Sequence, residues 1–172
     1  MKRNSSYRNR TSLVLRSAAT LVFLVSSTIL NAQKLHDFSG TWTQDNEKSD
    51  DYYNTFDVTV VINHSDETII FKETFYDKTG KELATRESAF TLDGKESSVE
   101  EQGGINKESA TWSTDKQTLT TKSTRTEETD VYGSTSDYSN SDDGNVLTIQ
   151  TSDINPFGLS IKQIFNKKQQ TG

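Results

Sequence analysis

The stretch Asp37-Phe38-Ser39-Gly40-Thr41-Trp42 opens the part of the chain that we expect to fold. Glycine allows backbone bends that other residues avoid, so Gly40 can turn the chain into a first strand. Residues of the types in Thr41-Trp42-Thr43 favour a pleated, half-buried surface. Phe38 and Trp42 fall on one face, where a large aromatic side chain can fill one end of a core. We therefore predict that Gly40 and Trp42 are structural anchors, with contact between Trp42 and a ligand as the lesser alternative.

Residues 1–32 show the three-part pattern of a secretory signal peptide. Five basic residues come first, an apolar run centred on Leu21-Val22-Phe23-Leu24-Val25 follows, and Leu30-Asn31-Ala32 offers a cleavage site before Gln33. The apolar run is too short and too serine-rich for a comfortable membrane span. We expect a cleaved leader, with an uncleaved anchor as the alternative, and a single domain over residues 33–172. This domain is expected to be exported to the periplasm or beyond the cell, with no stable membrane span after cleavage.

Composition limits the classes of partner for this domain. The chain has 172 residues and no Cys, so no disulfide can stabilise it in an oxidising compartment. The full chain carries 19 Lys and Arg against 25 Asp and Glu; without the five basic residues of the leader, 14 against 25 remain and the formal charge is −11. An acidic exported domain is a poor partner for nucleic acid. Its 30% hydrophobic content is low, but the abundant Thr suits strands rather than disorder.

Short segments of strand-like composition, separated by turn residues, follow one another along the chain. Alternation of apolar and polar residues is clear in Phe56 to His64, where every second side chain shares one face. After the first strand at Gly40, we predict strands near residues 56–64, 68–76, 82–92, 97–100, 109–113, 118–127, 130–139, 146–151 and 157–165. Gln102 to Asn106 is expected to be a flexible connection, and a helix over Leu159 to Phe165 is the second-ranked alternative. The pattern predicts an all-β antiparallel meander barrel of about 8–10 strands. We expect this barrel to be monomeric, and its closure would remove exposed sheet edges.

Several short motifs add a resemblance to a known family. Phe38-Ser39-Gly40-Thr41-Trp42 followed by Glu47-Lys48-Ser49 resembles the start of bacterial lipocalin-like domains. The later Asp93-Gly94-Lys95-Glu96, two hairpins with an aromatic residue, Ser, an acidic turn and Leu-Thr, and the closing Ile164-Phe165-Asn166-Lys167-Lys168 are similar to that family too. The resemblance implies a calycin-type barrel that can hold a small, usually hydrophobic, ligand.

Two arginines are the strongest candidates for ligand contact. Beyond the leader, Arg86 and Arg125 are the only arginines, and both fall within predicted strands. Arg86 is in phase with Phe90, and Arg125 with Leu119, so both side chains would project into the barrel if those faces look inward. A buried guanidinium group needs a carboxylate or comparable partner. Our hypothesis is that they hold the acidic head of an amphipathic ligand; the alternative is that they lie at the rim, paired with nearby glutamates.

The sequence gives only weak signals for metal binding or catalysis. His36 and His64 are the only histidines, their spacing is not that of metal ligands, and no Cys supplements them. The turn Asp142-Asp143-Gly144-Asn145 departs from the calcium-loop pattern, because Ser139 and Ser141 occupy its first two ligand positions. No residues suggest a catalytic site, so we expect no metal, no cofactor and no enzymatic activity.

The sequence leaves two functions open. The first is non-catalytic binding of a small apolar or amphipathic molecule inside the barrel. The second is an envelope or extracellular interaction module with a filled barrel, whose Thr- and Ser-rich strands meet a protein or a glycan. A continuous interior cavity of several hundred Å³ would favour the first function, because ligand sites are typically concave and about 300–1,000 Å³ in volume.

Overall fold

The computed structural model describes residues 36–50, 54–154 and 158–169. The predicted leader, residues 1–32, lies outside the described residues. The described part of the chain contains ten β-strands and no helix, and correspondingly none of its segments is a helix of the length and apolarity needed to cross a membrane. The strands are β1 Gly40–Gln44, β2 Asp57–His64, β3 Thr68–Tyr76, β4 Glu82–Thr91, β5 Ser97–Glu101, β6 Gly104–Trp112, β7 Thr118–Glu127, β8 Asp130–Asn140, β9 Val146–Asp153 and β10 Ser160–Lys167.

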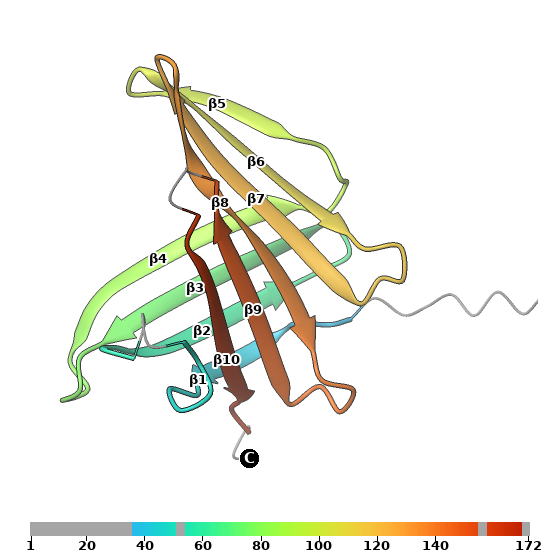
Figure 1. Cartoon of the computed structure of the whole chain (residues 1–172). Coiled ribbons are helices and arrows are strands. Elements are labelled where there is room, and N and C mark those ends of the chain that lie inside the picture. The colour runs from blue at the N-terminus through green and yellow to red at the C-terminus, as the bar shows by residue number, and fades with distance from the viewer. Residues whose placement is uncertain (1–35, 51–53, 155–157, 170–172) are drawn as a thin grey trace, which may run out of the picture. The chain divides into compact units, whose positions relative to one another are not determined.

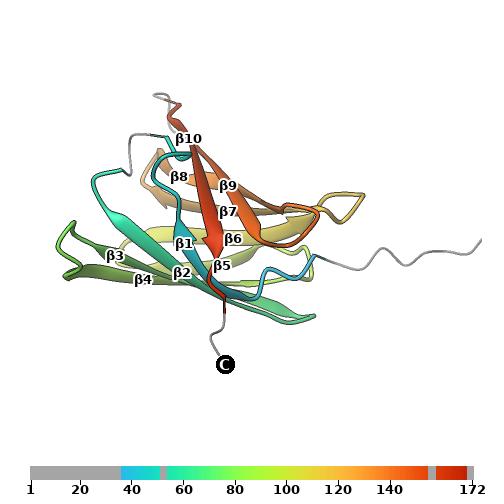
Figure 2. The same cartoon turned by 90° about the horizontal axis from the view of Figure 1, so that it is seen from below.

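All ten strands belong to one antiparallel sheet (Figure 1). Their order is β4-β3-β2-β1-β10-β9-β8-β7-β6-β5, so each strand pairs with its neighbour in sequence except across the β4–β5 connection. The first and last strands are adjacent, with Trp42 opposite Lys167. Strands β2–β4 and β7–β9 lie on opposite sides of the interior, joined through β1 and β10 (Figure 2). The predicted all-β meander is confirmed.

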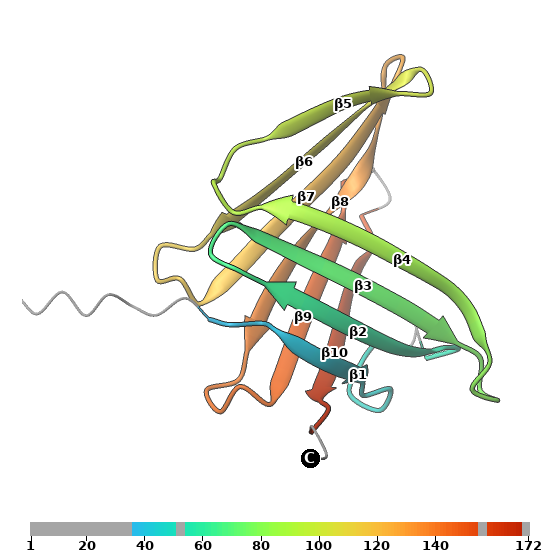
Figure 3. The same cartoon turned by 180° about the vertical axis from the view of Figure 1, so that it is seen from behind.

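The strand ring has a seam between β4 and β5. These two strands are consecutive, yet they diverge from their short connection (Figure 3), and no ladder within the described residues pairs them. The expectation that closure removes exposed edges is therefore wrong at this seam. Every residue of β5 is exposed, and the edge strands β4 and β5 expose the apolar residues Leu83 and Val99 among mainly charged and hydroxyl side chains. The charged side chains protect these edges in place of pairing.

Two local predictions need correction. The segment predicted as a flexible connection, Gln102 to Asn106, contains the start of β6, which begins at Gly104 and pairs with β7 along its whole length. Only Gln102 and Gly103 form the turn, and both have positive φ, of 49° and 76°. The helical alternative over Leu159 to Phe165 is also wrong, because Ser160–Lys167 is strand β10, hydrogen-bonded to β9 and β1.

Aromatic and aliphatic side chains fill one end of the interior. Trp42 is fully buried and its indole N–H donates to the Phe38 carbonyl oxygen at 2.9 Å. The Phe38 ring stacks on Trp112, with the ring centroids 5.7 Å apart. The other large, fully buried side chains come from five strands and are Val58, Val60, Ile62, Ile69, Leu119, Leu147 and Phe165. The period-2 alternation of each strand places these residues inward, and the interior becomes polar beyond them.

Candidate functional site

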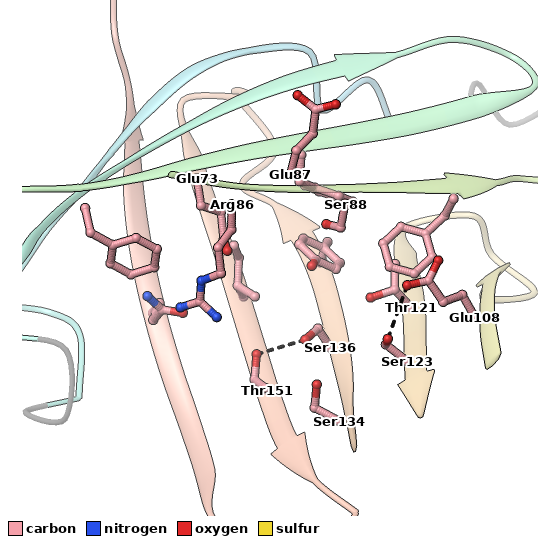
Figure 4. Close-up of a pocket in the computed structure, with 16 residues that line it drawn as sticks. Glu73, Arg86, Glu87, Ser88, Glu108, Thr121, Ser123, Ser134, Ser136 and Thr151 are labelled. Carbon is pink, nitrogen blue, oxygen red and sulfur yellow. Dashed lines mark hydrogen bonds between the residues drawn. The ribbon is translucent and has the colours of Figure 1, made fainter. Parts of the chain in front are cut away.

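A cavity of about 310 Å³ occupies the polar part of the interior (Figure 4). It lies between the inner faces of β3 and β4 on one side and β6 to β10 on the other. Apolar walls come from five residues: Phe71, Phe75, Phe90, Tyr138 and Ile149. Hydroxyl and amide groups line much of the rest, from Ser88, Thr121, Ser123, Ser134, Ser136, Thr151 and Gln163. A ligand here would meet aromatic surface and hydrogen-bonding groups together.

Glu73 and Arg86 are the charged pair on the β3–β4 wall. The two residues are directly opposite in the register of these strands, and both line the cavity. The Arg86 guanidinium carbon lies 4.7 Å from the centre of the Phe75 ring. Among the described residues, neither side chain forms a hydrogen bond or an ion pair, with each other or with a third group. Burial raises the pKa of Glu73, and the positive charge of Arg86 offsets part of this rise.

The opposite wall carries the hydroxyl groups and a second carboxylate. Ser136 and Thr151 share a hydrogen bond of 2.9 Å between their hydroxyl oxygens, and the Ser123 hydroxyl donates a long bond of 3.4 Å to Glu108. The Tyr138 ring stacks on Phe71 with 4.6 Å between centroids. Burial raises the pKa of Tyr138 to about 12, so its phenol remains a neutral hydrogen-bonding group. Figure 4 shows these hydroxyls facing the wall that carries Arg86.

Arg125 lies in a different environment from Arg86. Its side chain donates to Glu127 at 2.6 Å and to the side-chain oxygen of Asn106 at 3.1 Å. The guanidinium group also contacts Gly104, where an added Cβ would lie 2.9 Å from it. Arg125 lines a second hollow that adjoins the cavity at Glu108 and Ser123. The structure does not bring the two guanidinium groups into one cavity: Arg86 lines the interior cavity and Arg125 the adjoining hollow.

The two predicted anchors lie at the apolar end, away from the cavity lining. Gly40 has φ of +138°, and a Cβ at this position would lie 2.9 Å from Cε of Lys167. The Lys167 ammonium group lies 5.0 Å from the centre of the Trp42 ring. His64 is nearby: its Nδ1 accepts the Phe38 backbone N–H at 3.3 Å, and burial lowers its pKa despite the attraction of Asp37 and Asp66. His64 therefore packs in the core as a neutral acceptor.

In the acidic turn after β8, the Asp143 carboxylate accepts hydrogen bonds from groups of the same turn. The Asp143 carboxylate accepts from Ser141 at 2.6 Å and from the backbone and side chain of Asn145, and these bonds lower its pKa to about 2. Within residues 36–50, 54–154 and 158–169, no group of three His, Cys, Asp or Glu side chains is arranged to hold a metal ion.

A broad hollow also lies on the outer surface. It is formed by Ser39, Gly40 and Thr41 with Val61, Ile62 and Asn63 of β2, and with Asn145 and Lys167 to Gln169. Its volume of about 940 Å³ is larger than that of the interior cavity. Because it is also more open to solvent, it is the weaker candidate for a small-molecule site.

Sequence reasoning selected Arg86 but missed Glu73, Glu108 and the hydroxyl groups. The signal for Glu73 was present, since it lies between Phe71 and Phe75 at the spacing of two residues that defines one face of a strand. A carboxylate between two inward aromatic residues indicates a polar site within a core. Ser134, Ser136 and Thr151 gave no comparable signal, because Ser and Thr occur on both faces of these strands.

Comparison with solved structures shows similarity of fold. A REP1-NXSQ fatty acid transporter matches with a TM-score of 0.54 at 12% identity, over 77% of this chain and 97% of that chain. A secretary abundant heat soluble (SAHS) protein from Ramazzottius varieornatus matches with a TM-score of 0.49 at 10% identity, over 76% of this chain and 94% of that chain. A fatty-acid-binding protein from Manduca sexta matches with a TM-score of 0.45 at 11% identity, over 76% of this chain and 99% of that chain.

The likeness to the fatty acid transporter shows a similar β-barrel fold, and the calycin-type, bacterial lipocalin-like family suggested by the sequence stays a prediction. No protein-family model matches the chain, and no curated protein matches it.

Proposed function

We propose that this chain is an exported, monomeric, non-catalytic binding protein that holds a small amphipathic ligand in its interior cavity. The observation that carries the proposal is the cavity itself, about 310 Å³ between β3–β4 and β6–β10, lined by aromatic rings on some sides and hydroxyl groups on others. Its volume lies at the low end of the roughly 300–1,000 Å³ of small-molecule sites. The cavity favours this function over an interaction module, for which we expected a filled barrel.

Two further observations support the proposal. A protein described as a fatty acid transporter shares the fold, which makes an interior site a natural place for a ligand in this architecture. The leader pattern of residues 1–32 supports export to the periplasm or beyond the cell. Export is tested by the intact mass of the protein recovered from the envelope or the medium, which should correspond to a chain that begins near Gln33.

Native mass spectrometry of the purified protein tests the binding site. We expect a bound small molecule in a 1:1 ratio that organic solvent releases. Ser134→Leu should abolish this bound mass, because the new side chain fills the cavity and the Ser134 side chain takes part in no hydrogen bond with the described residues. Thr135→Leu is the matched control, since Thr135 is the next residue of β8 and points to the other face. Equal retention of the bound mass by both variants would contradict an interior site.

A further inference from the structure

We infer that the ligand is a small zwitterion, an apolar molecule that carries an ammonium and a carboxylate group on the same carbon, as an α-amino acid does. This inference rests on the proposed function and names the class of its ligand. Glu73 and Arg86 together form the recognition pair: the carboxylate receives the ammonium group and the guanidinium group receives the carboxylate.

The geometry of the pair matches two adjacent charges of opposite sign. Glu73 and Arg86 are directly opposite on neighbouring antiparallel strands, a relation that puts their Cβ atoms about 4.5–5.5 Å apart on one face of the sheet. Side chains of this length can reach each other from such positions, yet they form no ion pair among the described contacts. Arg86 instead lies over the Phe75 ring at 4.7 Å. Both groups therefore keep their hydrogen-bonding capacity available to a molecule in the cavity.

The balance of charge in the cavity selects against a simple fatty acid. Three glutamates, Glu73, Glu87 and Glu108, line the cavity beside Arg86. A ligand with only a carboxylate would pair with Arg86 but meet like charge from these glutamates. A ligand with only an amine would pair with Glu73 but make no contact of opposite charge with Arg86, which is exposed to solvent. A zwitterion satisfies both groups: burial raises the pKa of Glu73 and the charge of Arg86 offsets only part of this rise, so an ammonium group beside the Glu73 carboxylate would add to its compensation.

The rest of the cavity accommodates the remainder of such a molecule. Phe71, Phe75 and Phe90 provide apolar surface, and Phe71 and Phe90 pack edge to face with 6.2 Å between centroids. A short alkyl or aromatic side chain can lie against these rings. The hydroxyl groups of the opposite wall, Ser134 among them, can serve the polar atoms that the charged pair does not reach.

A matched series of eight-carbon compounds tests the inference by isothermal titration calorimetry on the mature chain. The series is octanoic acid, octylamine, 1-octanol and L-2-aminooctanoic acid. We expect the amino acid to bind at least about tenfold more tightly than the other three, since each charge-assisted hydrogen bond contributes at least about that factor. Glu73→Gln should remove the advantage over octanoic acid, and Arg86→Met should remove the advantage over octylamine.

A control variant outside the cavity lining keeps the test specific. Arg125→Met removes the guanidinium group that pairs with Glu127, and it should preserve the order of affinities. Circular dichroism confirms that each variant folds. Binding of octanoic acid as tight as that of the amino acid, or unchanged affinities in Glu73→Gln, would overturn the zwitterion while leaving the cavity as a binding site. Failure of all four compounds to bind would also overturn it, and only the lack of any bound mass in native mass spectrometry would overturn the proposed function as well.

Discussion

Replacement of Trp42 should produce the largest loss of stability of any single side chain at the apolar end. The indole ring is fully buried, and its N–H donates to the Phe38 carbonyl oxygen at 2.9 Å. Truncation of a buried aromatic residue to alanine costs about 3–5 kcal/mol, and we expect Trp42→Ala to fall in this range. This is a large share of the roughly 5–15 kcal/mol that stabilises a typical domain. Trp42→Phe keeps an aromatic ring but leaves the Phe38 carbonyl oxygen unpaired, at a cost of about 1–3 kcal/mol.

The assay is urea denaturation followed by far-ultraviolet circular dichroism, because the substitution itself changes the tryptophan fluorescence. Thr43→Ala is the control, since Thr43 is the next residue of β1 and is exposed; it should change the free energy of unfolding by no more than about 0.5 kcal/mol. A loss below about 1 kcal/mol for Trp42→Ala would refute the assignment of Trp42 as the core anchor.

Two further predictions concern the backbone and the pH dependence of stability. Gly133→Ala should lower the melting temperature far more than Gly144→Ala: a Cβ at Gly133 would lie 2.1 Å from the Ser123 carbonyl oxygen, whereas one at Gly144 meets nothing within 4 Å and adds only the left-handed strain of about 1 kcal/mol. Similar melting temperatures for the two variants would contradict the close approach of β7 and β8. The second prediction concerns His64, whose pKa is lowered by burial in the folded state. Between this lowered pKa and the value near 6.5 in the unfolded chain, the unfolded chain binds more protons than the folded one. The free energy of unfolding therefore decreases as the pH falls through this range. Denaturation at about pH 7.5 and about pH 5.5 should show this loss in the wild type and a smaller one in His64→Gln; equal losses would show that His64 is not the group responsible.

The fold was accessible from the sequence because its signals are local. Alternation in Phe56 to His64 and in Thr68 to Tyr76 gave β2 and β3, and turn residues separated the later strands. The seam between β4 and β5 was not accessible, because nothing in Asp93-Gly94-Lys95 distinguishes a turn that pairs two strands from one that separates them. Pairing depends on how the whole sheet coils, which is a property of all ten strands together.

The site was accessible only in part, for a similar reason. The phase of Arg86 with Phe90 placed its side chain inward, and the structure puts it at the cavity. The same reasoning applied to Arg125 did not separate the cavity from the adjoining hollow, where Glu127 and Asn106 hold the guanidinium group. Strand phase tells which face a residue occupies, but its position along the interior depends on register across several strands.

The most direct test of the central claim, that the interior cavity is the binding site, is amide chemical-shift mapping of the isotopically labelled mature chain. The titrant is whichever compound of the eight-carbon series binds most tightly. We predict shifts concentrated at cavity-lining positions of β3, β4, β8 and β9, including Glu73, Arg86 and Ser136. Shifts confined to the outer hollow around Thr41, Asn63 and Lys167, with those cavity positions unmoved, would contradict the claim.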